Sequence, residues 1–414
     1  MRKKKDIIFP KVKDRQELFN GEMPKGYVDG FGDKPLFEHS FNKAQKLEQE
    51  SKFNQAILEY QKCLSHAKAT ETNKVNLNIR IGKCYYSISK LKDAARHYKE
   101  AISISKNVKD KDERLHGESA ALGNIGLIYS DLGRPDEALK YHQQALEIHQ
   151  KIGDEKGIAI QIGNIGLIYR NLGKPDEALQ CHQQALEIHQ KIVHEQGTAI
   201  ALGNIGLIYQ DLGNAEKALE YHQQALEIDQ KIGYELGIAS DFNNIGLIYQ
   251  DLGNPDEALK YHQQALEIHQ KIGNEKGMAN QFGNIGLIYL KLGNPDEALK
   301  YHQQALEIHR KIGYEKGTAN ALGNIGLIYS DLDKPDEALE YHQQALGIHQ
   351  KIGYKKGTAS VLGNIGLIYL KLSKPDEALE YLKQALEIFK RIKAQRQFEM
   401  ISNNIKKIKE QYQK

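Results

Sequence analysis

The sequence has no tryptophan and only three cysteines, Cys63, Cys84 and Cys181, among 414 residues. The cysteines lack the paired spacing of a zinc site, and an odd, sparse count is typical of a reducing compartment. No run of 18 apolar residues occurs, and only residues 7–9 are apolar after the first charges, which is too short for a signal-peptide core. We therefore expect a cytoplasmic protein with no membrane partner, no metal and no cofactor.

Neither sign of charge dominates. The 57 lysines and arginines against 54 aspartates and glutamates give a net charge of +3. Nucleic-acid binding usually needs a clustered basic face, whereas the basic runs here occupy the ends, at residues 2–5 and 406–409. Terminal runs of this kind are typical of solvated tails or caps, so we expect no nucleic-acid partner.

The sequence also lacks the motifs of a catalytic site. No nucleophile elbow, phosphate-binding loop or cysteine–histidine pairing is present. Acidic pairs such as Asp136 and Glu137 stand at predicted helix starts, where they favour the helix dipole. The sequence therefore predicts that the chain is not an enzyme.

The dominant feature is a period of 40 residues. The string Gly-Asn-Ile-Gly-Leu-Ile-Tyr begins at Gly123 and recurs every 40 residues to Gly363, with Asn243 replacing the glycine in one copy. Seven near-identical units run from 119 to 394, and two diverged units occupy 41–118. The segment 1–40 is predicted to be irregular, and 395–414 to be a capping helix. Each unit of such an array packs on its neighbours, so the chain needs no single large core.

Each unit contains two predicted helices. Leu122, Ile125 and Tyr129 recur at the spacing of one buried helix face, and Gly133 stands where left-handed backbone geometry ends a helix. The second helix is expected to end at Gly153, with residues 154–156 as the connection to the next unit.

The start of the second helix has its own signature, which is clearest in the copy at 254. Asn254 is the expected N-cap, Pro255 stands at the first helical position, where its missing N–H costs nothing, and Glu257 completes a capping box.

The pattern of small and large residues resembles the tetratricopeptide repeat, and the residues that carry it are Leu122, Ile125, Gly126, Tyr129, Ala138 and Ala145. The 40-residue form is similar to that of Pins/LGN polarity scaffolds, kinesin light chains and prokaryotic signalling scaffolds. The resemblance implies an all-α, right-handed α-α superhelix (a TPR solenoid) of about nine helix-turn-helix repeats with a C-terminal capping helix. It also implies a scaffold or adaptor that binds a peptide or helical segment of a partner protein in its concave groove.

In this family the first helix of each repeat lines the concave groove. An asparagine at one position of that helix contacts the peptide backbone in peptide-binding members, and an amide can both donate and accept hydrogen bonds. The matching residues are Asn124, Asn164, Asn204, Asn244, Asn284, Asn324 and Asn364. The alternative is that these amides bond to the neighbouring repeat and only fasten the stack.

Two further sets of residues belong to the expected groove. A leucine ladder would form an apolar floor, or else pack between first helices; it consists of Leu127, Leu167, Leu207, Leu247, Leu287, Leu327 and Leu367. Variable positions near the end of the first helix would read specificity, or else drift freely on an exposed surface; they include Arg170, Gln210, Gln250, Asp131, Asp211, Asp251, Lys291 and Lys371.

The histidines recur seven residues apart, as in His142 and His149. Two zinc ligands on one helix normally stand three or four residues apart, and the last unit has Leu382 and Phe389 at both equivalent positions. These are therefore interpreted as packing positions, and protonation near pH 6 is predicted to loosen their contacts between repeats.

Three functions stay open at this stage. The leading one is the adaptor. The others are a self-associating structural protein, with homo-oligomers, and a peptide-sensing receptor that acts through a separate effector. A further hypothesis is that residues 9–11 or 27–31 fold back into the groove.

Overall fold

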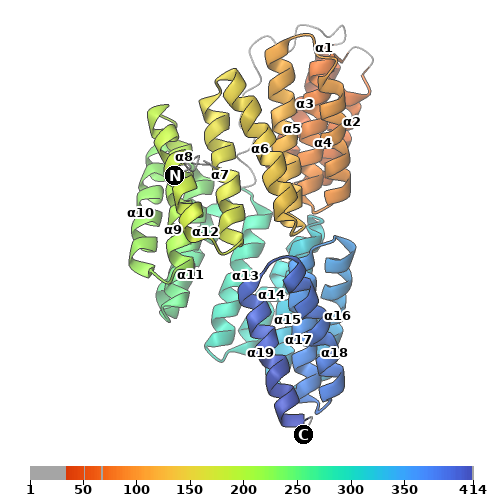
Figure 1. The fold of residues 1–414 in the computed structure, drawn as a ribbon, viewed down its shortest axis with the longest axis vertical. Helices are drawn as coiled ribbons and strands as arrows, with labels where there is room; N and C mark the ends of the chain where they lie inside the picture. Colours follow the sequence, from red (N-terminus) through yellow and green to blue (C-terminus); the bar gives the residue numbers. More distant parts are fainter. Residues whose placement is uncertain (1–33, 51, 67–68, 413–414) are drawn as a thin grey trace, which may run out of the picture. The chain divides into compact units, whose positions relative to one another are not determined.

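The computed structural model describes residues 34–412, with gaps at 51 and 67–68. Over these residues the chain forms helices α1 to α19 and no strand (Figure 1). The hypothesis that residues 9–11 or 27–31 enter the groove lies outside the described residues. The prediction that residues 1–40 are irregular is wrong at the C-terminal end of that range, because α1 already begins at Lys34.

The helices form nine consecutive pairs and one final helix, which confirms the all-α repeat fold. The first helices of the pairs are α1 (Lys34–Gln49), α3 (Glu71–Ser87), α5 (Lys111–Asp131), α7 (Glu155–Asn171), α9 (Glu195–Asp211), α11 (Glu235–Asp251), α13 (Glu275–Lys291), α15 (Glu315–Asp331) and α17 (Lys355–Lys371). The second helices are α2 (Phe53–Leu64), α4 (Leu91–Ser105), α6 (Pro135–Ile152), α8 (Pro175–Lys191), α10 (Ala215–Ile232), α12 (Pro255–Lys271), α14 (Pro295–Lys311), α16 (Pro335–Lys351) and α18 (Pro375–Arg391). Helix α19 spans Gln395–Tyr412.

The chain divides into two compact units. The first takes the residues up to Ser130 together with Pro135–Leu252, and the second takes Asp131–Arg134 together with Gly253–Lys414. Within each unit a helix packs against the helices before and after it in the sequence, for example α7 against α6 and α8, or α15 against α14 and α16. Consecutive first helices also contact one another directly, α7 with α9 and α9 with α11 in one unit, α13 with α15 and α15 with α17 in the other. The first helices therefore form a layer of their own.

Glycine and proline set the helix boundaries as the sequence predicts. Gly133 and Gly153 adopt φ angles of +67° and +69°, a conformation in which a side chain would be strained. Pro255 stands in the first turn of α12, and Asn254 precedes it as N-cap. The capping box itself is wrong, because the Asn254 side chain accepts no cap hydrogen bond. Asn214 does so for α10, accepting from the N–H of Lys217 at 3.1 Å.

The connection between pairs is shorter than predicted. Residues 154–156 were expected to link two units, but Glu155 already begins α7 and Asp154 is its N-cap. The Asp154 carboxylate accepts from the N–H of Gly157 at 2.9 Å, which explains why the helix starts there. The shorter link brings the following residue, Lys156, into the first helix.

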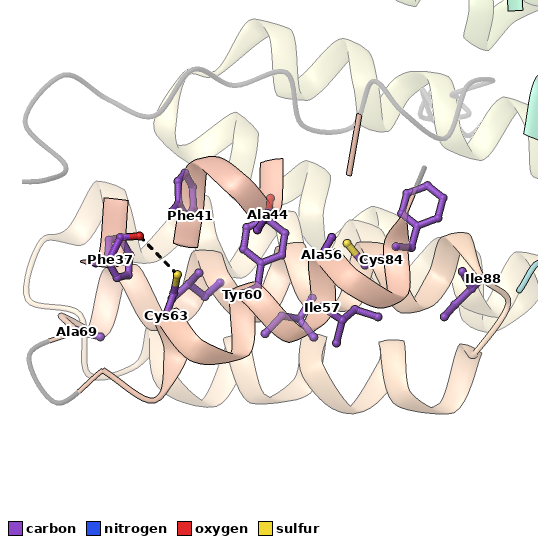
Figure 2. Close-up of a cluster of buried hydrophobic side chains, with 13 residues drawn as sticks. Phe37, Phe41, Ala44, Ala56, Ile57, Tyr60, Cys63, Ala69, Cys84 and Ile88 are labelled. Carbon is purple, nitrogen blue, oxygen red and sulfur yellow. Dashed lines mark hydrogen bonds between the residues drawn. The ribbon is translucent and has the colours of Figure 1, made fainter. Parts of the chain in front are cut away.

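The two diverged N-terminal pairs are held by an aromatic core. Tyr60 is fully buried between α1 and α2, with its ring 5.8 Å from that of Phe41 in an edge-on arrangement (Figure 2). Cys63 and Cys84 are buried in the same cluster, and the Cys63 thiol lies 3.8 Å from the Phe37 carbonyl oxygen. Burial raises the pKa of the Cys63 thiol to about 11, so this cysteine packs as a small apolar residue.

The C-terminal helix covers the last pair. Ile401 and Ile408 of α19 are buried against Leu382 and Phe389 of α18. This confirms that Leu382 and Phe389 occupy packing positions beneath the final helix. Their apolar side chains stand where the other pairs carry histidine because the neighbour here is an apolar helix face.

Candidate partner-binding surface

Helix α15 leaves one narrow face open to solvent, and α11, α13 and α17 do so at the same amide and leucine positions. In α15 the buried residues include Thr318, Ala319, Leu322, Ile325 and Ile328. The residues left exposed or half-exposed along one face are Lys316, Asn320, Gly323, Asn324, Leu327, Ser330 and Asp331. Their spacing of three, four and seven residues places them on one side of a helix with 3.6 residues per turn. We call these seven positions, and their equivalents 40 residues apart, the first-helix stripe.

The predicted asparagine ladder lies at one edge of the stripe but is unevenly open. Asn124, Asn164 and Asn204 are buried, at 4% exposure or less. The remaining four, Asn244, Asn284, Asn324 and Asn364, are half-buried. The open part of the ladder is therefore its later part.

Two asparagines of the ladder show where an amide can bond. Asn124 donates to the carbonyl oxygen of Ala120 at 2.9 Å, one turn earlier in its own helix. Asn244 accepts from the Asn243 side chain at 3.4 Å. Both bonds are local to one helix, and neither fastens one repeat to the next.

The leucine ladder shows the same trend. Leu207 is buried at 3% exposure, and Leu127, Leu167, Leu247, Leu287 and Leu327 are half-buried. Leu367 of α17 is 41% exposed. An apolar floor is thus present in both units, and its most open residue is in the second.

The variable positions pair with one another across consecutive first helices. Arg170 of α7 binds both carboxylate oxygens of Asp211 in α9, one of them at 2.9 Å. Gln210 donates to Asp251 of α11 at 2.9 Å, and Lys371 of α17 donates to the Ser330 carbonyl oxygen at 2.8 Å. These pairs were not predicted from the sequence. The signal that could have revealed them is that residues 41 positions apart carry side chains able to bond to one another. These exposed contacts contribute little stability, about 0–1 kcal/mol each, but they fix the side chains that border the stripe. Gln250 and Asp131 are half-buried, and Lys291 is exposed.

The recurrent histidines are internal. His142, His302 and His342 have no exposed surface, and burial lowers the pKa of each imidazole to about 4. The His142 ring donates from Nδ1 to the Gln161 side-chain oxygen of the next pair, at 2.9 Å. The interpretation of these histidines as packing residues is therefore confirmed.

Stacked tyrosines fill the space between the two helices of a pair. Tyr129 and Tyr141 stack at 5.2 Å between ring centroids, and Tyr329 and Tyr341 at 5.3 Å. In the pair of α7 and α8 the second tyrosine is replaced by Cys181, which is buried at 4% exposure. Cys181 thus takes the place of a packing residue.

One joint departs from the repeat. Asp241 of α11 stands where other units carry alanine, glutamine or valine, and its carboxylate lies 3.7 Å from Nδ1 of the buried His222. Burial, and then the nearby Asp229, raise the pKa of Asp241 well above its usual range. The joint between α10 and α11 therefore contains a buried carboxyl group that the equivalent positions of the other six near-identical units lack. The sequence signal was an acidic residue at an otherwise uncharged position.

Comparison with known proteins settles the family. Profiles described as tetratricopeptide repeat match residues 119–151, 158–231, 238–311 and 317–391, which together exceed half of the chain. The chain belongs to the tetratricopeptide repeat family. A search of curated proteins gave no match.

Solved tetratricopeptide-like structures share the fold at low sequence identity. A Rap protein in complex with Competence and Sporulation Factor has a TM-score of 0.59 and 17% identity, over 86% of this chain and 98% of that one. Aspartyl phosphate phosphatase F from Bacillus subtilis has a TM-score of 0.54 and 15% identity, over 88% and 96%. A STAND protein with a tetratricopeptide repeat sensor from Pyrococcus horikoshii has a TM-score of 0.51 and 19% identity, over 80% and 48%. At such identities the likeness establishes the fold alone.

The tetratricopeptide array carries no membrane span in the part of the chain that the structure describes, since none of those helices is both long and apolar enough.

Proposed function

We propose that the chain is a protein-binding scaffold whose first-helix stripe holds a peptide or helical segment of a partner. The observation that carries the proposal is the stripe itself. Helices α11, α13, α15 and α17 bury their other faces and leave the amide and leucine positions half-buried or exposed, and consecutive first helices contact one another within each unit. Within a unit, accessible leucines flanked by amides suit a segment that offers both apolar side chains and backbone groups.

The glycines of the stripe support this reading. A Cβ built on Gly283 or Gly323 meets no atom within 4 Å, so neither glycine is required by packing among the chain's own atoms. Glycine inside a helix costs about 0.5–1 kcal/mol relative to alanine. Retaining glycine at an open position suits a surface that another backbone approaches closely.

A pull-down from the native host tests the proposal. The bait is the full chain, compared with a variant in which Asn284, Asn324 and Asn364 are changed to alanine. These three amides are half-buried and can reach a partner, whereas Asn204 is only 2% exposed. If each lost hydrogen bond costs about 1 kcal/mol, captured partner should fall at least tenfold.

The matched control changes Asn254 and Asn294 to alanine. Both are exposed N-caps whose side chains make no cap hydrogen bond, so the chemistry of the substitution is the same away from the stripe. Capture should persist with the control. Equal capture by the wild type and the stripe variant would refute the role of the ladder.

A second candidate function is a sensor that acts through a separate effector. The similar Rap structure was solved with a bound factor, Competence and Sporulation Factor, so a chain of this fold can hold a separate molecule.

Light scattering of the purified chain tests the third candidate function, a self-associating structural protein. A monomer that captures a partner favours binding, whereas concentration-dependent assemblies favour self-association.

A further inference from the structure

The two units differ in the charge that borders their stripes. In the second unit Lys276, Lys316 and Lys356 occupy one end of the stripes of α13, α15 and α17. The same position in the first unit carries Lys156, Gln196 and Leu236 in α7, α9 and α11, respectively. The first helices of the second unit therefore present a row of cations that the first unit lacks.

The opposite end of the stripe shows the same contrast. Lys291 and Lys371 are exposed there in α13 and α17, with Asp331 of α15 between them. The equivalent residues of α9 and α11 are Asp211 and Asp251. Because these positions lie two turns beyond the stripe glycine, they share its side of the helix. The stripes of α13 and α17 thus have lysine at both ends of the leucine and amide band, whereas α15 has Lys316 at one end and Asp331 at the other.

Two of the three lysines in the first row contact a tyrosine ring. The Lys276 ammonium lies 4.2 Å from the ring centroid of Tyr314, and the Lys316 ammonium 4.1 Å from that of Tyr354. Each tyrosine belongs to the next pair, so each contact spans a joint between repeats. Such contacts restrain the ammonium groups while leaving their charge intact, which lowers the entropy lost when a partner binds.

In α13 and α15 the band between the two ends of the stripe is more open than in α7 and α9. Asn280 and Asn320 are exposed, whereas their first-unit counterparts Ile160 and Ile200 are half-buried. The backbone at Gly283 and Gly323 faces space free of other atoms within 4 Å of a built Cβ. A guest chain can therefore reach the amides and leucines here with little displacement of side chains.

From this arrangement we propose that the stripes of α13, α15 and α17 bind an acidic, partly apolar segment of a partner protein. Acidic side chains of the segment meet the rows of Lys276, Lys316, Lys356 and of Lys291 and Lys371, and its apolar side chains lie on the leucines between them. The inference rests on the proposed function and names the charge and the place of the partner. Opposite charge guides the encounter and fixes the register of the segment.

Selection of random phage-displayed peptides against the full chain tests the assignment without a known partner. Enriched peptides should carry net negative charge. Binding of a synthetic enriched peptide should fall about tenfold for K276Q/K316Q/K356Q, and it should weaken as salt is added. The K276R/K316R/K356R variant keeps the charge and should keep the binding, which separates charge from any change in folding.

The matched control removes three lysines from second helices of the same unit, as K260Q/K300Q/K383Q, and should bind the peptide as the wild type does. Neutral or basic peptides, or acidic peptides that bind K276Q/K316Q/K356Q unchanged, would overturn the charge assignment. Loss of the same peptides on changing Asn284, Asn324 and Asn364 to alanine would still uphold the proposed function. A selection that yields no peptide at all would count against both.

Discussion

Lowering the pH from 7.5 to 5.5 will lower the melting temperature of this chain by roughly 10 °C. The cause is the set of buried imidazoles, in which burial lowers the pKa to about 4 at His142, His302 and His342, and also at His189, His269, His309 and His349. The unfolded chain binds protons to these residues near pH 6.5, whereas the folded chain does not until about pH 4. The contribution of these neutral imidazoles to the free energy of unfolding is therefore present above pH 6.5, and it is lost as the pH falls below that value.

The expected size follows from linkage. Each such histidine lowers the free energy of unfolding by on the order of 1 kcal/mol between pH 7.5 and 5.5, and several of them lie within one compact unit. Asp241 works in the opposite direction, because its raised pKa means that the folded state binds a proton more tightly than the unfolded state. The joint between α10 and α11 should resist acid better than the others. Thermal melts followed by circular dichroism at the two pH values measure the effect.

The last repeat supplies the control. Leu382 fills the same place under Gly366 that His302 and His342 fill under Gly286 and Gly326. His302→Leu and His342→Leu remove rings whose two nitrogens have no hydrogen-bond partner in the structure. The double variant should melt higher at pH 5.5 and depend less on pH. A melting temperature that is unchanged between pH 7.5 and 5.5 in the wild type would contradict the prediction.

Two glycines three residues apart in α13 will respond to alanine with opposite signs. A Cβ at Gly283 meets no atom within 4 Å, so Gly283→Ala should stabilise the chain by about 0.5–1 kcal/mol through helix propensity. A Cβ at Gly286 would lie 2.9 Å from the ring of His302 and 3.2 Å from the Ala298 carbonyl oxygen. Gly286→Ala should therefore destabilise it by about 2 kcal/mol.

Denaturant unfolding of the two variants measures the difference. Gly323 and Gly326 of α15 form a second, independent pair, since a Cβ meets nothing at the former and lies 3.0 Å from His342 at the latter. Asn243 shows that a side chain is accepted at the open position of α11. If Gly283→Ala destabilised the chain as much as Gly286→Ala, the glycine of the stripe would have a structural role instead of an open face.

The sequence predicts the array well because its signals are local. The spacing of Leu122, Ile125 and Tyr129, the left-handed Gly133 and the first-turn prolines each act within a few residues, and repetition adds the same evidence seven times. The start of α7 at Glu155 was missed because Asp154 caps the helix directly, and a short polar connection looks the same in sequence.

The candidate site was harder to predict because it depends on how repeats meet. The pairing of Arg170 with Asp211 and of Gln210 with Asp251 arises between helices that are distant in sequence. Asn204 is buried and Asn324 is half-buried although both stand in the same heptapeptide sequence, so the difference comes from the neighbouring side chains. Identical motifs thus occupy different environments. The sequence alone therefore does not distinguish the buried asparagines of the ladder from the accessible ones.

The bonds between repeats have a consequence for the length of the array. A side chain on one unit finds its partner at a fixed offset in the next, as Arg170 does with Asp211 and Gln210 with Asp251. If recombination removed residues 175–214, Arg170 would stand before Asp251, and Gly166 would lie over His222 in place of His182. The new joint would again have an acceptor for Arg170 and an imidazole under Gly166. The number of repeats can therefore change by whole units. Such a change would lengthen or shorten the surface offered to a partner and would keep these contacts between repeats.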